Sequence, residues 1–182
     1  MSVVLTATEV AALCGVDEGR VRKDVEHGIF VRPTFAFADL VYFAVVSALG
    51  LHLDVEGRRK LHDVITKALG ASRPPARTAL SPVLELRLDR VTRDVEGRLG
   101  RFEAWKKKRV SVDENVLGGE PVFAKTRLAV RHVGGMLLGG AREEDVREDY
   151  PYLTDEDIDL APVFTRAYPK MGRPRGREAP AR

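Results

Sequence analysis

The sequence has a single cysteine, Cys14, so it can form neither an intramolecular disulfide nor a cluster of thiolate metal ligands. Cys14 lies in an apolar pattern with Val10, Ala11 and Leu13, which predicts a buried structural thiol. Long apolar runs are also absent: the longest, residues 40–53, is too short to cross a bilayer and contains polar residues. The first residues lack the basic start and apolar core of a signal peptide. We therefore expect a cytoplasmic protein that does not bind membranes.

The signatures of common enzymes are missing as well. There is no glycine-rich phosphate loop, no nucleophile elbow and no Ser/His/Asp arrangement. His62 and His132 have no partner His or Cys at ligand spacing, which disfavours zinc. The acids between residues 143 and 149 would scatter around one helix as a solvated face. We expect no catalytic residue, no metal and no cofactor.

The composition suits a globular protein with a hydrophobic core, since 44% of the 182 residues are hydrophobic and 31% are charged. This length is enough for one medium domain or two small ones. The net charge is only +3. Binding to nucleic acid would therefore depend on a local basic surface, not on the charge of the whole chain.

Apolar residues recur at three- and four-residue spacing over most of the chain, with short alternating segments between them. This pattern predicts a mainly α fold with short β-hairpins. The helices are expected at residues 7–13, 17–27, 39–49, 54–69, 89–108, 129–138, 143–149 and 154–168. Strands are expected within 29–37, at 83–88, and at 110–112 paired with 121–123. The expected units are a winged helix-turn-helix (1–70), a linker, strand and connecting helix (71–108), a three-helix homeodomain-like domain (109–168) and a disordered basic tail (169–182).

The first unit has the pattern of a winged helix-turn-helix. Thr6 and Glu9 form a capping box, Asp17 caps the second helix, and residues 29–37 alternate as a β-wing would. On the second helix, Val21 and Val25 would face the core. Basic side chains on the opposite face and at the wing could contact phosphates and bases. These candidate DNA-binding residues are Arg20, Arg22, Lys23, His27 and Arg32.

This N-terminal pattern resembles the MerR-type winged helix domain. The resemblance is carried by residues 6–16, by Val21 and Arg22, and by the run 35–41, roughly the first quarter of the chain. It implies binding to operator DNA. The alternative is a helical packing module with a solvated charged face. Asp24 and Glu26 favour that alternative because carboxylates repel phosphate.

The C-terminal third contains a distinctive set of residues: 112–123, 126–130, Gly139, 149–151, Leu153, Thr154, Asp157 and Ile158. This set closely resembles a small homeodomain-like antitoxin domain that was long catalogued as a domain of unknown function. The resemblance implies a VapB-type antitoxin whose partner is a PIN-type, VapC-like ribonuclease toxin. Two departures stand out: Ala124-Lys125 occupies a turn that usually carries glycine, and Pro162 should kink or split the last helix.

Local chemistry agrees in part with this resemblance. Thr126 can cap the helix that begins near Ala129, and Arg127 can brace the hairpin against it. The last helix, however, carries acids at 155–157 and at Asp159, which duplex phosphates would repel. We therefore expect this domain to serve in assembly, through homodimerisation by the hairpin, toxin docking, or both.

The tail from Lys170 onward carries five basic residues against Glu178 alone, a charge of about +4. It has almost no apolar residues and should be disordered alone. PIN-type nucleases hold magnesium with carboxylates, which an arginine could pair with while displacing the metal. The alternatives are a minor-groove anchor resembling an AT-hook, and an inert solubilising tail. The candidate toxin-binding residues are Tyr168, Lys170, Arg173, Arg175 and Arg177.

Together with these patterns, the resemblance of the C-terminal third implies an antitoxin of a type II toxin–antitoxin system. It would neutralise a PIN-type ribonuclease and repress its own operon as a DNA-binding homodimer. The alternative is a stand-alone MerR-like transcriptional regulator without a toxin. An enzyme, such as a nuclease, is the third and least favoured hypothesis.

Overall fold

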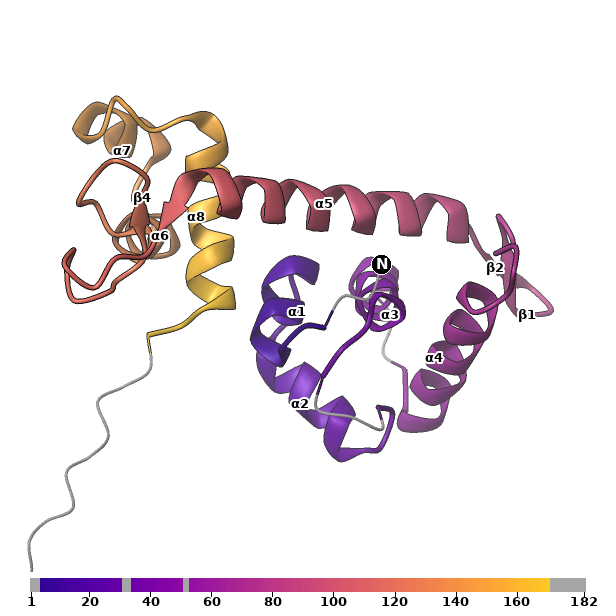
Figure 1. Ribbon diagram of the computed structural model, residues 1–182. Coiled ribbons are helices and arrows are strands. Elements are labelled where there is room, and N and C mark those ends of the chain that lie inside the picture. Colours follow the sequence, from indigo (N-terminus) through magenta and orange to yellow (C-terminus); the bar gives the residue numbers. More distant parts are fainter. Residues whose placement is uncertain (1–3, 31–33, 51–52, 171–182) are drawn as a thin grey trace, which may run out of the picture.

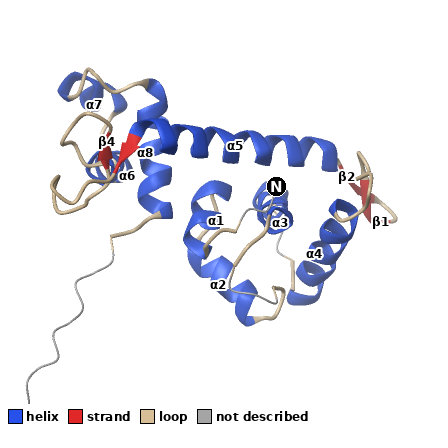
Figure 2. Cartoon of the chain, in the orientation of Figure 1, coloured by secondary structure: helices blue, strands red, loops and turns tan. Residues whose placement is uncertain are grey.

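The structure, a computed structural model, describes residues 4–30, 34–50 and 53–170. Within these ranges the chain forms eight helices and two small antiparallel sheets (Figures 1 and 2). The predicted mainly α fold with short hairpins is confirmed at this level.

The first two of the four N-terminal helices begin where the predicted capping residues lie. The Thr6 backbone N–H donates to Glu9 Oε2 at 2.8 Å, and the Glu9 N–H donates to Thr6 Oγ1 at 3.3 Å, which completes the capping box. Asp17 Oδ1 accepts from the Arg20 N–H at 3.3 Å in the same way. The helices are α1 (Ala7–Cys14), α2 (Glu18–Glu26), α3 (Phe37–Leu49) and α4 (Val55–Leu69).

The prediction of a β-wing over residues 29–37 is wrong for the part of it that the structure describes. Ile29 and Phe30 are buried outside any strand, and the Phe30 ring stacks on Phe43 of α3 at 5.3 Å between centroids. Phe35 forms an isolated antiparallel bridge with Leu5. The apolar alternation thus reflects burial against α3. Arg32, with its two neighbours, lies outside the described residues.

A small hairpin connects α4 to the long helix α5 (Leu88–Arg109). Its strands are β1 (Thr78–Ser81) and β2 (Leu84–Leu86), which pair antiparallel. The sequence pattern predicted the second strand but missed the first. Only Leu80 and Leu86 of the hairpin pack against the core. The sequence of β1 therefore lacks the alternation of apolar and polar residues that predicts a strand. The hairpin tip is solvated, and Val83 is 94% exposed.

The C-terminal unit follows the predicted order of a hairpin and three helices. Its elements are β3 (Val110–Ser111), β4 (Val122–Phe123), α6 (Val130–Leu138), α7 (Glu143–Asp149) and α8 (Asp155–Ala167). β3 and β4 pair antiparallel, with Val110 opposite Phe123. No helix among the described residues is both long and apolar enough to cross a membrane.

Three local predictions for this unit need correction. Helix α8 is not split at Pro162 but continues to Ala167, because packing against α6 and α1 stabilises it. Thr126 does not cap α6; its Oγ1 donates to Phe123 O at 2.8 Å and accepts from the Leu128 N–H at 3.1 Å, so it closes the preceding turn. Arg127 is exposed, and Arg131 braces the hairpin in its place, by an ion pair described below.

The turn at Ala124-Lys125 has the geometry that glycine would favour. Lys125 adopts a left-handed conformation with φ of 65°, which costs an L-residue about 1–2 kcal/mol. Because a lysine stands where glycine would be expected, the folded state pays a local conformational penalty at this turn.

Two hydrophobic cores meet along α5. The first holds α1 to α4 together with Leu88, Val95 and Leu99 of α5. The second holds α6 to α8 together with Phe102 and Trp105. Helix α8 also packs on α1 (Figure 1), so a second contact joins the two halves besides α5. The domain boundaries at residues 70, 108 and 168 stay predictions.

Cys14 is buried, as predicted, with 5% of its surface exposed. Its thiol donates to the carbonyl oxygen of Leu40 at 3.5 Å. Burial raises the pKa of Cys14 to about 12, so the thiolate that would react or bind metal does not form at neutral pH.

Candidate functional site

Helix α2 presents part of the predicted basic face to solvent. Lys23 and His27 are exposed, one helical turn apart. The Arg22 side chain is 68% exposed and pairs with Glu18 at 2.5 Å. Arg20 differs from the prediction: its side chain is 29% exposed, and its Nε lies 3.6 Å from Asp24 Oδ1. The cations on the outer face of α2 are therefore Arg22, Lys23 and His27, whereas Arg20 lies partly inward.

Asp24 does not face solvent, contrary to the interpretation that it would repel phosphate. Its carboxylate is fully buried and accepts a 2.8 Å hydrogen bond from the Tyr42 hydroxyl of α3. It also forms an ion pair with the buried Arg58 of α4. Burial, together with the bond to Asp24, raises the pKa of Tyr42. This network fixes α2 against α3 and α4 and leaves Glu26 as the exposed acid near the C-terminal end of α2.

The sequence contained a signal for this inward position. Asp24 follows Val21 by three residues, the spacing that places two side chains on one helix face, and Val21 is fully buried. Its partners Tyr42 and Arg58 lie 18 and 34 residues away along the chain, and no local pattern connects them.

A second polar junction holds the end of α8 against α1. The Tyr168 hydroxyl donates to Glu9 Oε1 at 2.7 Å and accepts from Lys106 Nζ at 2.9 Å. Burial opposes the ionisation of Glu9, but hydrogen bonds from Tyr168 and Thr6 outweigh it and lower the pKa of Glu9. Burial and the bond to Glu9 raise the pKa of Tyr168. The structure therefore places this predicted toxin-binding residue at the contact between the two halves.

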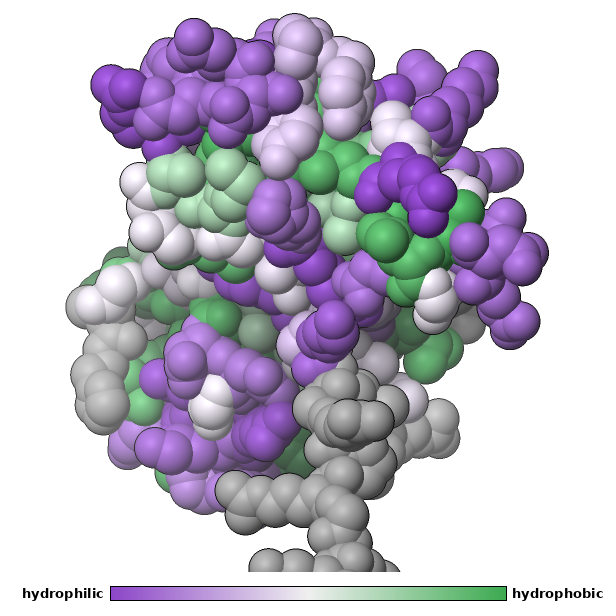
Figure 3. Space-filling view, turned by 90° about the vertical axis from the view of Figure 1, so that its left-hand side faces the viewer, coloured by the Kyte–Doolittle hydropathy of each residue, from purple (hydrophilic) through white to green (hydrophobic). Residues whose placement is uncertain are grey.

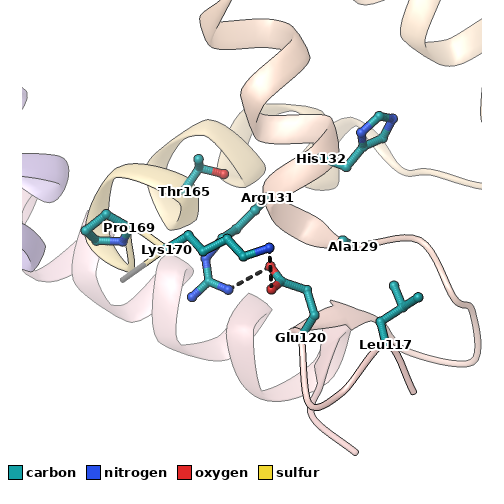
Figure 4. A pocket seen from close by; sticks show the side chains of 8 residues that line it. All are labelled: Leu117, Glu120, Ala129, Arg131, His132, Thr165, Pro169 and Lys170. Atoms are coloured by element: carbon teal, nitrogen blue, oxygen red, sulfur yellow. Dashed lines mark hydrogen bonds and ion pairs between the residues drawn. The ribbon is translucent and has the colours of Figure 1, made fainter. Parts of the chain in front are cut away.

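A cavity of about 700 Å³ lies beside the point where the tail begins. Arg131 of α6 donates from Nη1 to Glu120 Oε1 at 2.7 Å and from Nε to the Tyr168 carbonyl at 2.6 Å. Lys170 Nζ lies 3.9 Å from Glu120 Oε2. Figure 4 shows these cations converging on Glu120. The lining residues are Leu117, Glu120, Ala129, Arg131, His132, Thr165, Pro169 and Lys170.

The structure describes only some of the predicted toxin-binding residues of the tail. Lys170 lies at the rim of this cavity with its side chain 80% exposed. Arg173, Arg175 and Arg177 lie outside the described residues. The surface on this side of the molecule carries hydrophobic patches between hydrophilic ones (Figure 3). Exposed large hydrophobic residues of the C-terminal unit are Val112, Leu117, Leu138 and Tyr152.

The four acids in the first half of α8 all have basic partners within the chain, and Asp155, Glu156 and Asp159 stay partly exposed. Asp157 is fully buried and accepts from Trp105 Nε1 at 2.8 Å and from Arg109 Nε at 2.9 Å. Glu156 and Asp159 both pair with Arg101 of α5, and Asp155 pairs with Arg147. The packing of α8 against α6 and α1 is a second obstacle to its entering a DNA groove.

The acids of α7 also have basic neighbours. Arg142 pairs with Asp145, and Arg147 pairs with Glu143 at 3.2 Å. Within the part of the chain that the structure describes, no three His, Cys, Asp or Glu side chains gather as metal ligands would.

Comparison with known proteins agrees with the position of the C-terminal unit. Residues 110–164 match the model of a family described as "Protein of unknown function (DUF433)". A segment of 66 residues is 36% identical to "Uncharacterized protein y4eO" of Sinorhizobium fredii (strain NBRC 101917 / NGR234). That segment covers 36% of this chain and 30% of the relative's length. No solved structure matches the chain.

Proposed function

We propose that this chain is the antitoxin of a type II toxin–antitoxin system and that it represses its own operon by binding DNA. The partner would be a PIN-type, VapC-like ribonuclease, and the repressor would be a cytoplasmic homodimer of the VapB type. We assign it no catalytic role.

The DNA-binding part of the proposal is supported by the outer face of α2. Arg22, Lys23 and His27 are exposed there, together with the acid Glu26. The other acid between these cations, Asp24, is buried and neutralised by its ion pair with Arg58. Cationic side chains on the second helix of a helix-turn-helix can contact phosphates and base edges. The resemblance of residues 6–16, Val21, Arg22 and residues 35–41 to MerR-type domains supports the same conclusion.

The antitoxin part is supported chiefly by the match of residues 110–164 to the family model. The family-like residues noted above resemble antitoxins of PIN-type nucleases. The basic tail adds a plausible inhibitory element, since an arginine entering a carboxylate cluster would form charge-assisted hydrogen bonds and compete with the metal. The tail starts beside exposed apolar residues and a cavity, which suits a protein partner.

The proposal is tested by co-expressing the chain with the nuclease encoded beside its gene and scoring growth and co-purification. Growth rescue with a stable complex is expected. A chain that ends at Lys170 keeps the Tyr168 junction and the whole described fold, so loss of rescue would place inhibition in residues 171–182.

A matched pair of variants controls for net charge. Replacing Arg173, Arg175 and Arg177 together by Gln should abolish rescue. Replacing three exposed cations of α5, Arg93, Lys107 and Lys108, by Gln should not. If the unmodified chain neither rescues growth nor forms a complex, the antitoxin proposal fails and a stand-alone regulator becomes the working hypothesis.

A further inference from the structure

Arg59, near the start of α4, contacts the C-terminal end of α2, and a second cation, Lys60, follows it in the chain. Arg59 Nη2 donates to the carbonyl oxygen of His27 at 3.1 Å, and His27 belongs to the exposed face of α2. The side chains of Arg59 and Lys60 are 44% and 74% exposed. Sequence patterns did not single out either residue, because α4 is separated from α2 by the whole of α3.

The position of α4 is set by buried contacts, so these cations are held in place. The neighbouring Arg58 points inward to Asp24 of α2, and its Nη2 lies 3.4 Å from His27 Nδ1. Asp54 caps the helix by accepting from the Gly57 N–H at 2.7 Å. Since Arg58 is anchored inside, the next two residues of the helix must point away from the core.

In the free protein the two cations share one acid. Glu56 lies 3.3 Å from Arg59 and 3.6 Å from Lys60. Exposed pairs of this kind are worth about 0–1 kcal/mol. A phosphate can therefore displace Glu56 at little energetic cost.

We propose that Arg59 and Lys60 extend the DNA-binding face of α2 and bind backbone phosphates beside the groove that α2 enters. This inference rests on the DNA-binding part of the proposed function. Contacts of this kind carry no sequence information but fix the register of the protein on the duplex. Glu56 would act as an internal competitor that weakens binding.

The experiment measures binding of the full chain to a fluorescein-labelled 30-base-pair duplex of arbitrary sequence by anisotropy, over a range of salt concentrations. The double variant R59A/K60A should lower the slope of log K against log salt by about 1–2 and weaken binding about tenfold at low salt. K60A alone should account for about half of the change in slope, and it keeps the Arg59 bond to His27.

Two controls match the changes in charge. K107A/K108A removes two exposed cations at the far end of α5 and should change the slope by much less. E56Q should strengthen binding, whereas E96Q, with the same charge change on α5, should have little effect. Circular dichroism checks that each variant is folded.

The outcomes separate this inference from the function on which it rests. If the unmodified chain does not bind the duplex even at low salt, DNA binding itself fails. If it binds and K23A weakens binding, but R59A/K60A behaves like K107A/K108A, the α4 contact is overturned.

Discussion

The crossing of α6 and α8 depends on the absence of a side chain at Gly134. A Cβ atom built there would lie 2.0 Å from Thr165 Oγ1 and 2.3 Å from the carbonyl oxygen of Ala161. Ordinary van der Waals contacts begin near 3.4 Å. The hydroxyl of Thr165 could rotate away, but the Ala161 carbonyl belongs to the backbone of α8. Substitution by alanine must therefore push the two helices apart.

The magnitude follows from two opposing terms. Overpacking a tight contact costs about 1–3 kcal/mol, and more where backbone must move. Alanine gains about 1 kcal/mol in helix propensity over glycine. Because the clash with Ala161 involves backbone, we expect the upper end of the overpacking cost, so Gly134→Ala should destabilise the C-terminal unit by about 2 kcal/mol net. Gly135→Ala is the matched control, since a Cβ there meets nothing within 4 Å, and it should stabilise by about 0.5–1 kcal/mol.

The assay is urea denaturation followed by the fluorescence of Trp105, the only tryptophan of the chain, which is buried in the C-terminal core. The double variant G134A/T165A should recover only part of the loss, because the Ala161 carbonyl still blocks the Cβ. If Gly134→Ala proved as stable as Gly135→Ala, the close approach of α6 and α8 described here would be wrong.

Three further predictions concern the buried polar contacts and the strained turn. Asp24→Asn should lower the free energy of unfolding by about 3 kcal/mol or more in urea titrations, because it leaves Arg58 buried without a countercharge; a loss under about 1 kcal/mol would contradict the network. Lys125→Gly should stabilise by about 0.5–1 kcal/mol, since glycine adopts the left-handed conformation freely, and a loss of stability would count against the turn. Glu9 has a pKa below its ordinary value of 4.5 in the folded state, so it contributes stability above pH 4.5 that is lost as the pH falls through the folded pKa. Tyr168→Phe removes one cause of that shift, and the stability difference from the unmodified chain should therefore shrink under acid; a difference that stays constant from pH 7 to pH 3 would refute the link.

Much of the fold was predictable because its determinants are local. Capping pairs such as Thr6 with Glu9 and Thr154 with Asp157 lie three residues apart, so the helix starts could be read from the sequence. The helices after β4 were predicted nearly to the residue, although only α8 begins with a capping pair. The basic outer face of α2 also followed from helical spacing alone, with the exception of Arg20.

The predictions that the structure contradicts share a different cause, because they depend on contacts between distant parts of the chain. Ile29 and Phe30 alternate like a strand but are buried against α3, and Pro162 stays within α8 because its neighbours hold the helix. In each case a tertiary contact outweighed a local preference. The candidate site also depends on a tertiary contact. The ion pair of Arg58 with Asp24 orients α4, and this orientation leaves Arg59 exposed.

The sequence by itself determined the helices, their caps, the basic tail and the resemblance of the C-terminal unit, because each depends on residues within a few positions of one another. Only the tertiary structure decided that Asp24 faces Arg58, that the acids of α8 are paired, and that Tyr168 reaches Glu9 across 159 positions. Such contacts reflect how whole helices pack their apolar faces, and no short segment encodes that arrangement.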